Sequence, residues 1–238
     1  MNKLHILTPV KDSVEIALKT IDSIMKSEIM VDYCYTVYND FSTDINTEKL
    51  EEAAKKLGFI LVNLKDVTMH PSPNYLLILQ TAQHRANFEN AHLLIIESDV
   101  IVEKNTIQQL YEYVSKLENP GMIATITTDS NKKINYPYLF AKRFNSKVVN
   151  TKKQLSFCCT LLTQSLLATI NFDTLNPERT WHDYFITHKS IELGFKNYLV
   201  TSLQVIHLQH SIYPWKHLKN SQPMKYYWNK IIDKFTNE

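Results

Sequence analysis

Glycine is scarce in this chain, which has three glycines among its 238 residues. Gly58, Gly121 and Gly194 lie far apart, so none of them belongs to a glycine-rich loop. The phosphate loops of P-loop proteins and of dinucleotide-binding proteins need several glycines at fixed spacing. Both classes are therefore excluded, and a nucleotide would have to bind without a glycine cradle.

Cysteine, charge of one sign and long apolar runs are lacking as well. The three cysteines are Cys34, Cys158 and the adjacent Cys159, an odd number that argues against a disulfide framework and favours a reducing compartment. The formal net charge is only +2, which shows no nucleic-acid footprint. No window approaches the roughly 18 apolar residues of a membrane-spanning helix, and the first residues lack the apolar segment of a secretory signal. The sequence thus predicts a cytoplasmic protein with no nucleic-acid partner.

Patterns typical of strands and helices alternate over the first 130 residues. Apolar or β-branched runs predict strands at residues 4–10, 33–38, 59–62, 92–96 and 122–127. Apolar positions at helical spacing predict helices at residues 14–25, 47–57, 75–89 and 105–117. Asp12 is expected to cap the first helix, and Gly58 to end the second. This order predicts an α/β fold, a Rossmann-like, mostly parallel sheet with helices on both faces.

The pattern changes after residue 130. Strands are expected at residues 136–144, 156–162 and 198–208, and helices at 164–170 and 184–193. We therefore divide the chain into a first lobe (1–130), a smaller mixed α+β lobe (131–210) and a tail (211–238). The tail is rich in aromatic residues and lysine, which fits either contact with an anionic membrane surface or a helix packed on the second lobe.

Two carboxylates, Glu97 and Asp99, directly follow the apolar run 93–96. Four apolar residues in a row fit a strand buried on both faces of a parallel sheet. In an extended segment, residues i and i+2 point to the same side, so both side chains are expected to face a ligand beyond the strand end. Mg²⁺ and Mn²⁺ prefer such oxygen ligands. The alternative is a pair of solvated charges that cap the next helix.

Four segments in this order resemble the family-2 glycosyltransferases of the GT-A fold. They are Ile6-Leu7-Thr8-Pro9-Val10-Lys11-Asp12, Tyr38-Asn39-Asp40-Phe41-Ser42-Thr43-Asp44, Glu97-Ser98-Asp99 in the place of an Asp-x-Asp motif, and Thr180-Trp181-His182-Asp183 through Gly194-Phe195 to Val205-Ile206-His207. Each motif alone is weak, but together they cover residues 4–210. The resemblance implies transfer of a sugar from a nucleotide-diphosphate-sugar to an acceptor hydroxyl, with inversion at the anomeric carbon.

The resemblance also implies roles for particular residues. Asp99 and His207 would hold Mn²⁺ or Mg²⁺, and Asp183 would take the proton of the acceptor hydroxyl. The donor is expected to be a UDP-sugar first of all, and the acceptor a carbohydrate or a lipid-linked molecule. The residues implied for the nucleotide are Thr8, Pro9, Lys11, Asp40, Glu97 and Ser98.

Several of these residues have a plainer interpretation. Asp40 fits an Asx turn, and Asp183 fits a carboxylate favoured by the helix dipole. Trp181 is as compatible with core packing as with a wall on which a sugar stacks. Weaker candidates for contact with nucleotide, metal or phosphate are Asp44, His210, Lys142 and Arg143.

Two departures from the family pattern leave other functions open. Phe41 stands where glycine is usual, so the turn there is expected to differ, and His182 stands where an acidic residue is usual. One alternative is a nucleotidyltransferase, although the first loop lacks the glycines that such enzymes normally have. The other alternative is a catalytically silent binding protein of the same fold.

Overall fold

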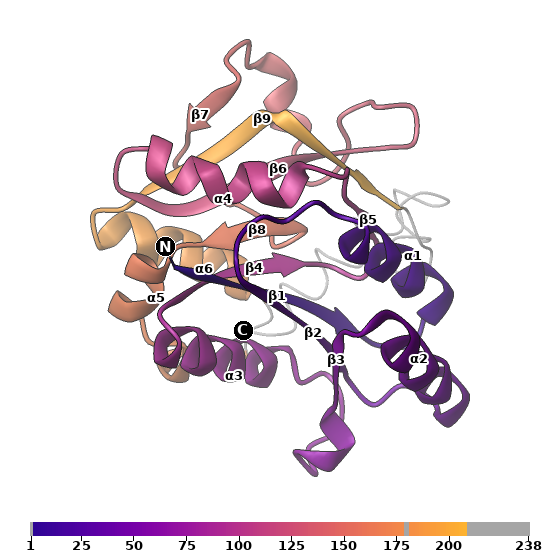
Figure 1. Ribbon diagram of the computed structural model, residues 1–238. Coiled ribbons are helices and arrows are strands. Elements are labelled where there is room, and N and C mark those ends of the chain that lie inside the picture. Colours follow the sequence, from indigo (N-terminus) through magenta and orange to yellow (C-terminus); the bar gives the residue numbers. More distant parts are fainter. Residues whose placement is uncertain (1, 179–180, 209–238) are drawn as a thin grey trace, which may run out of the picture. The chain divides into compact units, whose positions relative to one another are not determined.

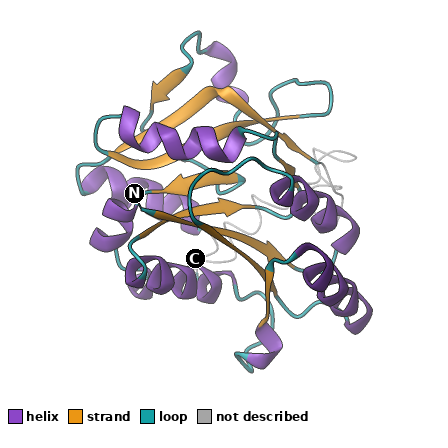
Figure 2. Ribbon diagram, in the orientation of Figure 1, coloured by secondary structure: helices purple, strands orange, loops and turns teal. Residues whose placement is uncertain are grey.

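A nine-stranded sheet forms the centre of the described part of the chain. The computed structural model describes residues 2–178 and 181–208. Figure 2 shows the strands running between helices. In chain order they are β1 (Lys3–Val10), β2 (Tyr33–Asn39), β3 (Ile60–Asn63), β4 (Ala91–Ile96), β5 (Val100–Ile101), β6 (Pro120–Thr128), β7 (Val148–Asn150), β8 (Cys159–Leu162) and β9 (Lys196–His207).

The strand order is β3-β2-β1-β4-β8-β6-β9-β5, and β7 pairs with β9. The first four strands in this order are parallel, as the alternation predicted. In contrast, β8 runs antiparallel to both β4 and β6, while β6 and β9 are parallel. The segments that we separated at residue 130 thus share one sheet, since β8 of the second lies between two strands of the first. A division of function between them stays a prediction.

Helices cover both faces of this sheet (Figure 1). Alternate residues of β4 belong to two apolar clusters, with Leu94 and Ile96 in one and Leu93 and Ile95 in the other, so β4 is buried on both faces as its apolar run predicted. The first cluster includes residues of α1 (Val14–Met25), α2 (Asp44–Leu57) and α4 (Thr106–Lys116). The second includes residues of α3 (Tyr75–Phe88), α5 (Gln164–Thr169) and α6 (His182–Glu192). The short 3₁₀ helices are η1 (Leu64–Asp66), η2 (Leu139–Arg143) and η3 (Phe172–Thr174).

The prediction of a strand at residues 136–144 is wrong. Pro137 has no N–H to donate to a sheet, and the residues that follow fold into η2. The buried Tyr138 hydroxyl donates to the Ser156 carbonyl oxygen at 3.1 Å and accepts from the Ser156 N–H at 2.9 Å. Phe140 packs edge-on against Tyr138. The aromatic residues of this segment are therefore packed by a helical turn.

Within residues 2–178 and 181–208, no helix has the length and apolar character needed to cross a bilayer. Residues 211–238, for which we predicted contact with a membrane surface, lie outside the described residues, as does His210.

His92 connects the buried β4 to the start of α5. Its Nδ1 accepts a hydrogen bond from the Gln164 N–H at 2.9 Å, and its ring packs edge-on against Tyr111. Burial lowers the pKa of His92 from 6.5 to about 4. The unfolded chain therefore takes up a proton before the folded chain does, and the free energy of unfolding falls as the pH drops through this window.

We predict a loss of about 2 to 3 kcal/mol from His92 between neutral pH and pH 4. Urea denaturation of the wild type and of His92→Asn at several pH values measures this loss, because asparagine can accept the same hydrogen bond without titrating. The wild type should lose stability more steeply than the variant as the pH falls. If the free energy of unfolding fell equally steeply with pH in both proteins, the effect attributed to the lowered pKa of His92 would be contradicted.

Candidate active site

Residues predicted to bind the nucleotide and the cation follow strands that end at one edge of the sheet. Strand β1 is parallel to both of its neighbours, β2 and β4. Lys11, Asp40 and Glu97 come directly after these three strands. The carboxyl ends of parallel strands meet at one edge, which is where ligands of open α/β sheets bind. Side chains far apart in the sequence are thereby brought to the same edge.

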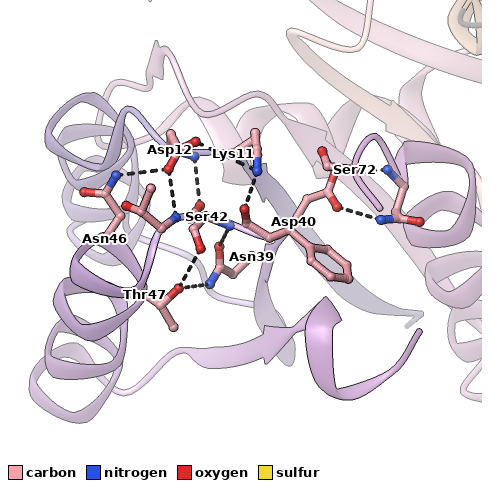
Figure 3. A network of polar contacts seen from close by, with 11 residues as sticks. Lys11, Asp12, Asn39, Asp40, Ser42, Asn46, Thr47 and Ser72 are labelled. Carbon is pink, nitrogen blue, oxygen red and sulfur yellow. Dashed lines mark hydrogen bonds and ion pairs between the residues drawn. The ribbon is translucent and has the colours of Figure 1, made fainter. Parts of the chain in front are cut away.

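Hydrogen bonds join two loops at this edge (Figure 3). The Lys11 ammonium, in the loop after β1, donates to the Phe41 carbonyl oxygen in the loop after β2. The Asp12 N–H donates to Ser42 Oγ at 2.8 Å, and Asp12 Oδ1 accepts from the Thr43 N–H at 3.0 Å. The hydrogen bond from Thr43 lowers the pKa of the Asp12 carboxyl. Lys11 therefore has a protein partner, and its contact with a nucleotide stays a prediction.

The prediction that Asp12 caps α1 is wrong. Ser13 occupies the cap position, and no side chain there accepts a capping hydrogen bond. The Asp12 carboxylate instead accepts from Thr43 and Asn46 at the start of α2. Asp12 and Ser13 both adopt the left-handed backbone region, with φ of 50° and 48°, and the chain bends at Asp12 before the helix begins.

Phe41 also has a left-handed backbone, with φ of 55°. Glycine adopts this region without a steric penalty, whereas a residue with a side chain is destabilised there by about 1 to 2 kcal/mol. Phenylalanine in the place of the usual glycine therefore keeps the conformation that favours glycine. Contacts with the second apolar cluster, against which Phe41 packs, offset part of this strain.

Asp40 holds the segment that leads into α3. Its Oδ2 accepts from Ser72 Oγ at 2.7 Å and from the Asn74 N–H at 2.9 Å, while Oδ1 accepts from Asn74 Nδ2 at 2.9 Å. The side chain is buried, and both of its oxygens have protein partners. The observed contacts are structural, and contact with a nucleobase stays a prediction.

Asp40→Asn is expected to destabilise the fold. An amide offers one accepting oxygen instead of two, so a buried donor of Asn74 loses its partner, at a cost of about 1 to 3 kcal/mol in the free energy of unfolding. Urea denaturation measures this change. Asp44→Asn is the matched control, because Asp44 is exposed at the start of α2. Equal losses from the two substitutions would contradict the structural role of Asp40.

Other residues predicted to contact the ligand have structural neighbours. Thr8 is buried, and its Oγ1 accepts from the Tyr35 hydroxyl at 3.0 Å, so its side chain faces the core. Ser98 offers its carbonyl oxygen to the Thr20 hydroxyl at 2.9 Å. Pro9 lies partly exposed near the end of β1. Lys142 and Arg143, at the end of η2, and Asp44, at the start of α2, are exposed.

The acidic pair ends β4 in a turn, not in the extended segment that the sequence predicted. The Val100 N–H donates to the Glu97 carbonyl oxygen at 3.2 Å, which closes the turn. Next, β5 pairs with β9 so that Val100 lies opposite His207. This pairing brings His207 to Asp99, with 3.2 Å between His207 Nε2 and Asp99 Oδ2. Strand pairing, not the i, i+2 spacing, therefore brings the acidic residues to the histidine.

Cys158 approaches the acidic pair from the neighbouring strand. The Glu97 N–H donates to the Cys158 carbonyl oxygen at 3.0 Å, which extends the ladder between β4 and β8. Cys158 Sγ lies 3.4 Å from Glu97 Oε2. One potential ligand atom each of Glu97, Cys158 and His207 lies within 4.8 Å of the others. Of the two metal ligands predicted, His207 belongs to this cluster and Asp99 forms an ion pair with it.

The carboxylates of this cluster lie close enough to influence one another. Burial raises the pKa of Glu97 to about 7, and the negative charge of Asp99 adds to the rise. Burial opposes protonation of His207, but its hydrogen bond and charge interaction with Asp99 leave the pKa of the imidazole raised. A divalent cation would supply the positive charge that this group of carboxylates favours.

His207 is oriented as metal-binding histidines are. Its Nδ1 lies 3.0 Å from the Tyr136 carbonyl oxygen, which can only accept, so Nδ1 carries a proton. In a neutral imidazole the lone pair is then on Nε2, the atom that faces Asp99. Metal-binding histidines commonly donate their other N–H to such a carbonyl. The imidazole and the carboxylates are thus donors that fit Mn²⁺, the carboxylates also fitting Mg²⁺.

Asp183 lies in the first turn of α6, and both of its carboxylate oxygens accept hydrogen bonds. The Tyr184 N–H donates to Oδ1 at 2.8 Å, and Gln154 Nε2 donates to Oδ2 at 2.8 Å. Burial raises the pKa of Asp183. The charge of Asp183 also contributes to the raised pKa of Glu97, and its role as the base stays a prediction.

Trp181 precedes α6 and is 66% exposed. This exposure excludes the core-packing interpretation of Trp181. Its role as a wall for a sugar stays a prediction.

The sequence analysis missed two residues of this site, Cys158 and Tyr75. Tyr75 begins α3, and its buried hydroxyl has no hydrogen-bond partner among the described residues. Burial raises the pKa of Tyr75 well above its ordinary value, and the charges of Glu97 and Asp183 add to the rise. Its ring stacks on His182, with ring centroids 6.2 Å apart. The cysteine pair beside an apolar run was a usable signal for Cys158, whereas no local pattern pointed to Tyr75.

Comparison with known proteins supports the fold through structure alone. No family model matches the chain, and no curated protein matches it by sequence. The S. aureus TarS fragment has a TM-score of 0.65 at 14% identity, over 87% of this chain and 60% of that chain. GalNAc-T7 with UDP, GalNAc and Mn²⁺ has a TM-score of 0.65 at 12% identity, over 88% of this chain and 44% of that chain. The mannosyltransferase PcManGT from Pyrobaculum calidifontis was solved in complex with GDP-Man and Mn²⁺. It has a TM-score of 0.64 at 13% identity, over 97% of this chain and 64% of that chain.

The chain has the GT-A fold. The predicted fold class is therefore confirmed. This GT-A chain spans about 60% of the length of the TarS fragment and less than half of GalNAc-T7. Because identities are 12–15%, the likeness establishes the fold, and the chemistry has to be argued from the site.

Proposed function

We propose that this GT-A protein is a metal-dependent, inverting glycosyltransferase. It transfers a sugar from a nucleotide-diphosphate-sugar to the hydroxyl of a carbohydrate or lipid-linked acceptor, with Mn²⁺ or Mg²⁺ as cofactor. The observation that carries the proposal is the geometry at the end of β4. Asp99 Oδ2 lies 3.2 Å from His207 Nε2, and potential ligand atoms of Glu97, Cys158 and His207 lie within 4.8 Å of one another.

A UDP-sugar is the first donor to test. TarS has been solved with UDP-GlcNAc, and GalNAc-T7 with UDP, while PcManGT was solved with GDP-Man. Lys11 is the one cationic side chain among the residues proposed for the nucleotide, so a cation is needed to balance the diphosphate. The proposed nucleotide contacts are Thr8, Pro9, Lys11, Asp40, Glu97 and Ser98.

Asp99 and His207 are the residues proposed to hold the cation. When bound, it stabilises the negative charge that develops on the departing diphosphate. On the other side, Asp183 accepts the proton of the acceptor hydroxyl as that oxygen attacks the anomeric carbon. Burial strengthens this base, because it raises the pKa of Asp183. A single carboxylate acting as base, without a second as nucleophile, leads to inversion of the anomeric centre.

A panel of nucleotide-sugars tests the proposal. The full chain is incubated with UDP-, GDP- and CDP-sugars, with Mn²⁺, with Mg²⁺ or with EDTA, and released nucleoside diphosphate is measured. We expect release from at least one donor that EDTA abolishes and Mn²⁺ restores. Nucleotide binding without any release would favour a silent binding protein, and formation of a nucleotide-sugar from a nucleoside triphosphate would favour a nucleotidyltransferase.

A further inference from the structure

We propose that the Cys158 thiol is a ligand of the cation site, together with Glu97 and His207, so that this site also takes thiophilic divalent ions such as Zn²⁺ and Cd²⁺. The inference rests on the proposed function in that both place a cation here. Its test, however, needs no turnover.

The geometry brings a thiol, an imidazole and a carboxylate together from three strand ends. Their potential ligand atoms all lie within 4.8 Å of one another. A shared ion lies about 2.0 to 2.3 Å from oxygen, nitrogen and sulfur ligands, so donors around one tetrahedral ion lie about 3.3 to 3.8 Å apart. Side-chain adjustments of up to about 1 Å therefore bring all three donors to one ion. Asp99, 3.2 Å from His207 Nε2, is a candidate for a fourth donor.

Cys158 has polar neighbours, unlike a cysteine that only fills the core. Its sulfur lies 3.3 Å from Ser156 Oγ and 3.4 Å from Glu97 Oε2. The next residue, Cys159, is buried too, but its sulfur is not among the clustered potential ligand atoms, and burial raises its pKa to about 12. Cys159 thus serves as a matched control for a buried thiol that lies outside the cation site.

The mixed donor set predicts which ions Cys158 favours. Thiolate ligands select soft or borderline ions such as Cd²⁺ and Zn²⁺, whereas carboxylates suit Mn²⁺ and Mg²⁺. When the ion binds, the S–H bond breaks, the proton passes to the solvent, and the sulfur lone pair forms the bond to the metal. No electron is transferred, so no oxidant or reductant is required. Because both kinds of ion would use the same residues and the thiolate favours the softer ion, a thiophilic ion should displace Mn²⁺.

Cobalt titration of the reduced full chain tests this inference directly. A cobalt–thiolate bond gives a charge-transfer absorption in the near ultraviolet that oxygen and nitrogen ligands do not give. We expect this band in the wild type, in Cys34→Ala and in Cys159→Ala, and its loss in Cys158→Ser. Calorimetry should show Cd²⁺ affinity about tenfold or more weaker in Cys158→Ser, with Mn²⁺ affinity within about twofold of the wild type.

Each outcome separates this inference from the proposed function. If Co²⁺ binds the wild type without a thiolate band, or if the band persists in Cys158→Ser, then Cys158 is not a ligand, while the Mn²⁺ site proposed above still stands. If no divalent ion binds, with or without UDP or GDP, both proposals fall. The wild-type band needs no variant, so a folding defect of Cys158→Ser does not obscure the result.

Discussion

Asp99→Asn is expected to lower Mn²⁺-dependent release of nucleoside diphosphate by about 100-fold or more. The substitution keeps the shape of the side chain but removes the charge that pairs with His207 across 3.2 Å. It also removes a proposed ligand of the cation. The loss should appear as weaker activation by Mn²⁺, measured as kcat/KM over a range of Mn²⁺ concentrations.

Asp66→Asn is the matched control for this substitution. Asp66 is exposed in η1, so activity and thermal stability should stay at the wild-type level. Because Asp99 is buried, the melting temperature of Asp99→Asn has to be compared as well. A folded Asp99→Asn protein with undiminished Mn²⁺ activation would show that Asp99 has no part in binding the cation.

Asp183→Asn is expected to lower kcat for transfer by about 1,000-fold. An amide cannot take up the proton of the acceptor hydroxyl. Its oxygen can still accept the hydrogen bond that the Tyr184 N–H donates to Oδ1. The affinity for UDP or GDP with Mn²⁺, measured by calorimetry, should stay within about twofold of the wild type, since the base touches the acceptor and not the nucleotide.

Asp173→Asn is the matched control, because it also removes one carboxylate charge. Asp173 lies in η3 with its side chain 48% exposed and pairs with His84, so transfer should be unaffected. If Asp183→Asn lowers nucleotide affinity as much as kcat, Asp183 supports the donor site and is not the base. Unchanged kcat would exclude it from the reaction.

Local patterns were sufficient to predict the elements around the edge of the sheet where β1, β2 and β4 end. The apolar run before Glu97 predicted a strand buried on both faces, and Leu93 to Ile96 do contribute to both apolar clusters. Gly58 was predicted to end a helix, and it does so with φ of 84°. These features depend on a few consecutive residues, whose periodicity and backbone freedom are visible in the sequence.

Long-range pairing could not be predicted in the same way. The insertion of β8 between β4 and β6 decides that Cys158 lies beside Glu97, and the pairing of β5 with β9 decides that His207 meets Asp99. Neither follows from spacing along the chain. The i, i+2 argument assumed an extended segment, whereas the pair lies in a turn. Resemblance to a family supplied the link to His207.

Errors in the sequence analysis arose where side chains served a distant segment. Aspartate is a residue type that often caps helices, yet the Asp12 carboxylate accepts hydrogen bonds from Thr43 and Asn46 at the start of α2. The aromatic residues around Tyr138 alternate as in a strand, yet they pack as a helical turn against Ser156. In both cases a tertiary hydrogen bond outweighs the local preference.

The central claim is that a cation and a nucleoside diphosphate bind together at the turn after β4. Anomalous diffraction from crystals soaked with Mn²⁺ and UDP or GDP tests it most directly. The account predicts a manganese peak within coordination distance of Asp99 and His207, in contact with both phosphates. A peak elsewhere, or a nucleotide bound away from the ends of β1, β2 and β4, would contradict it.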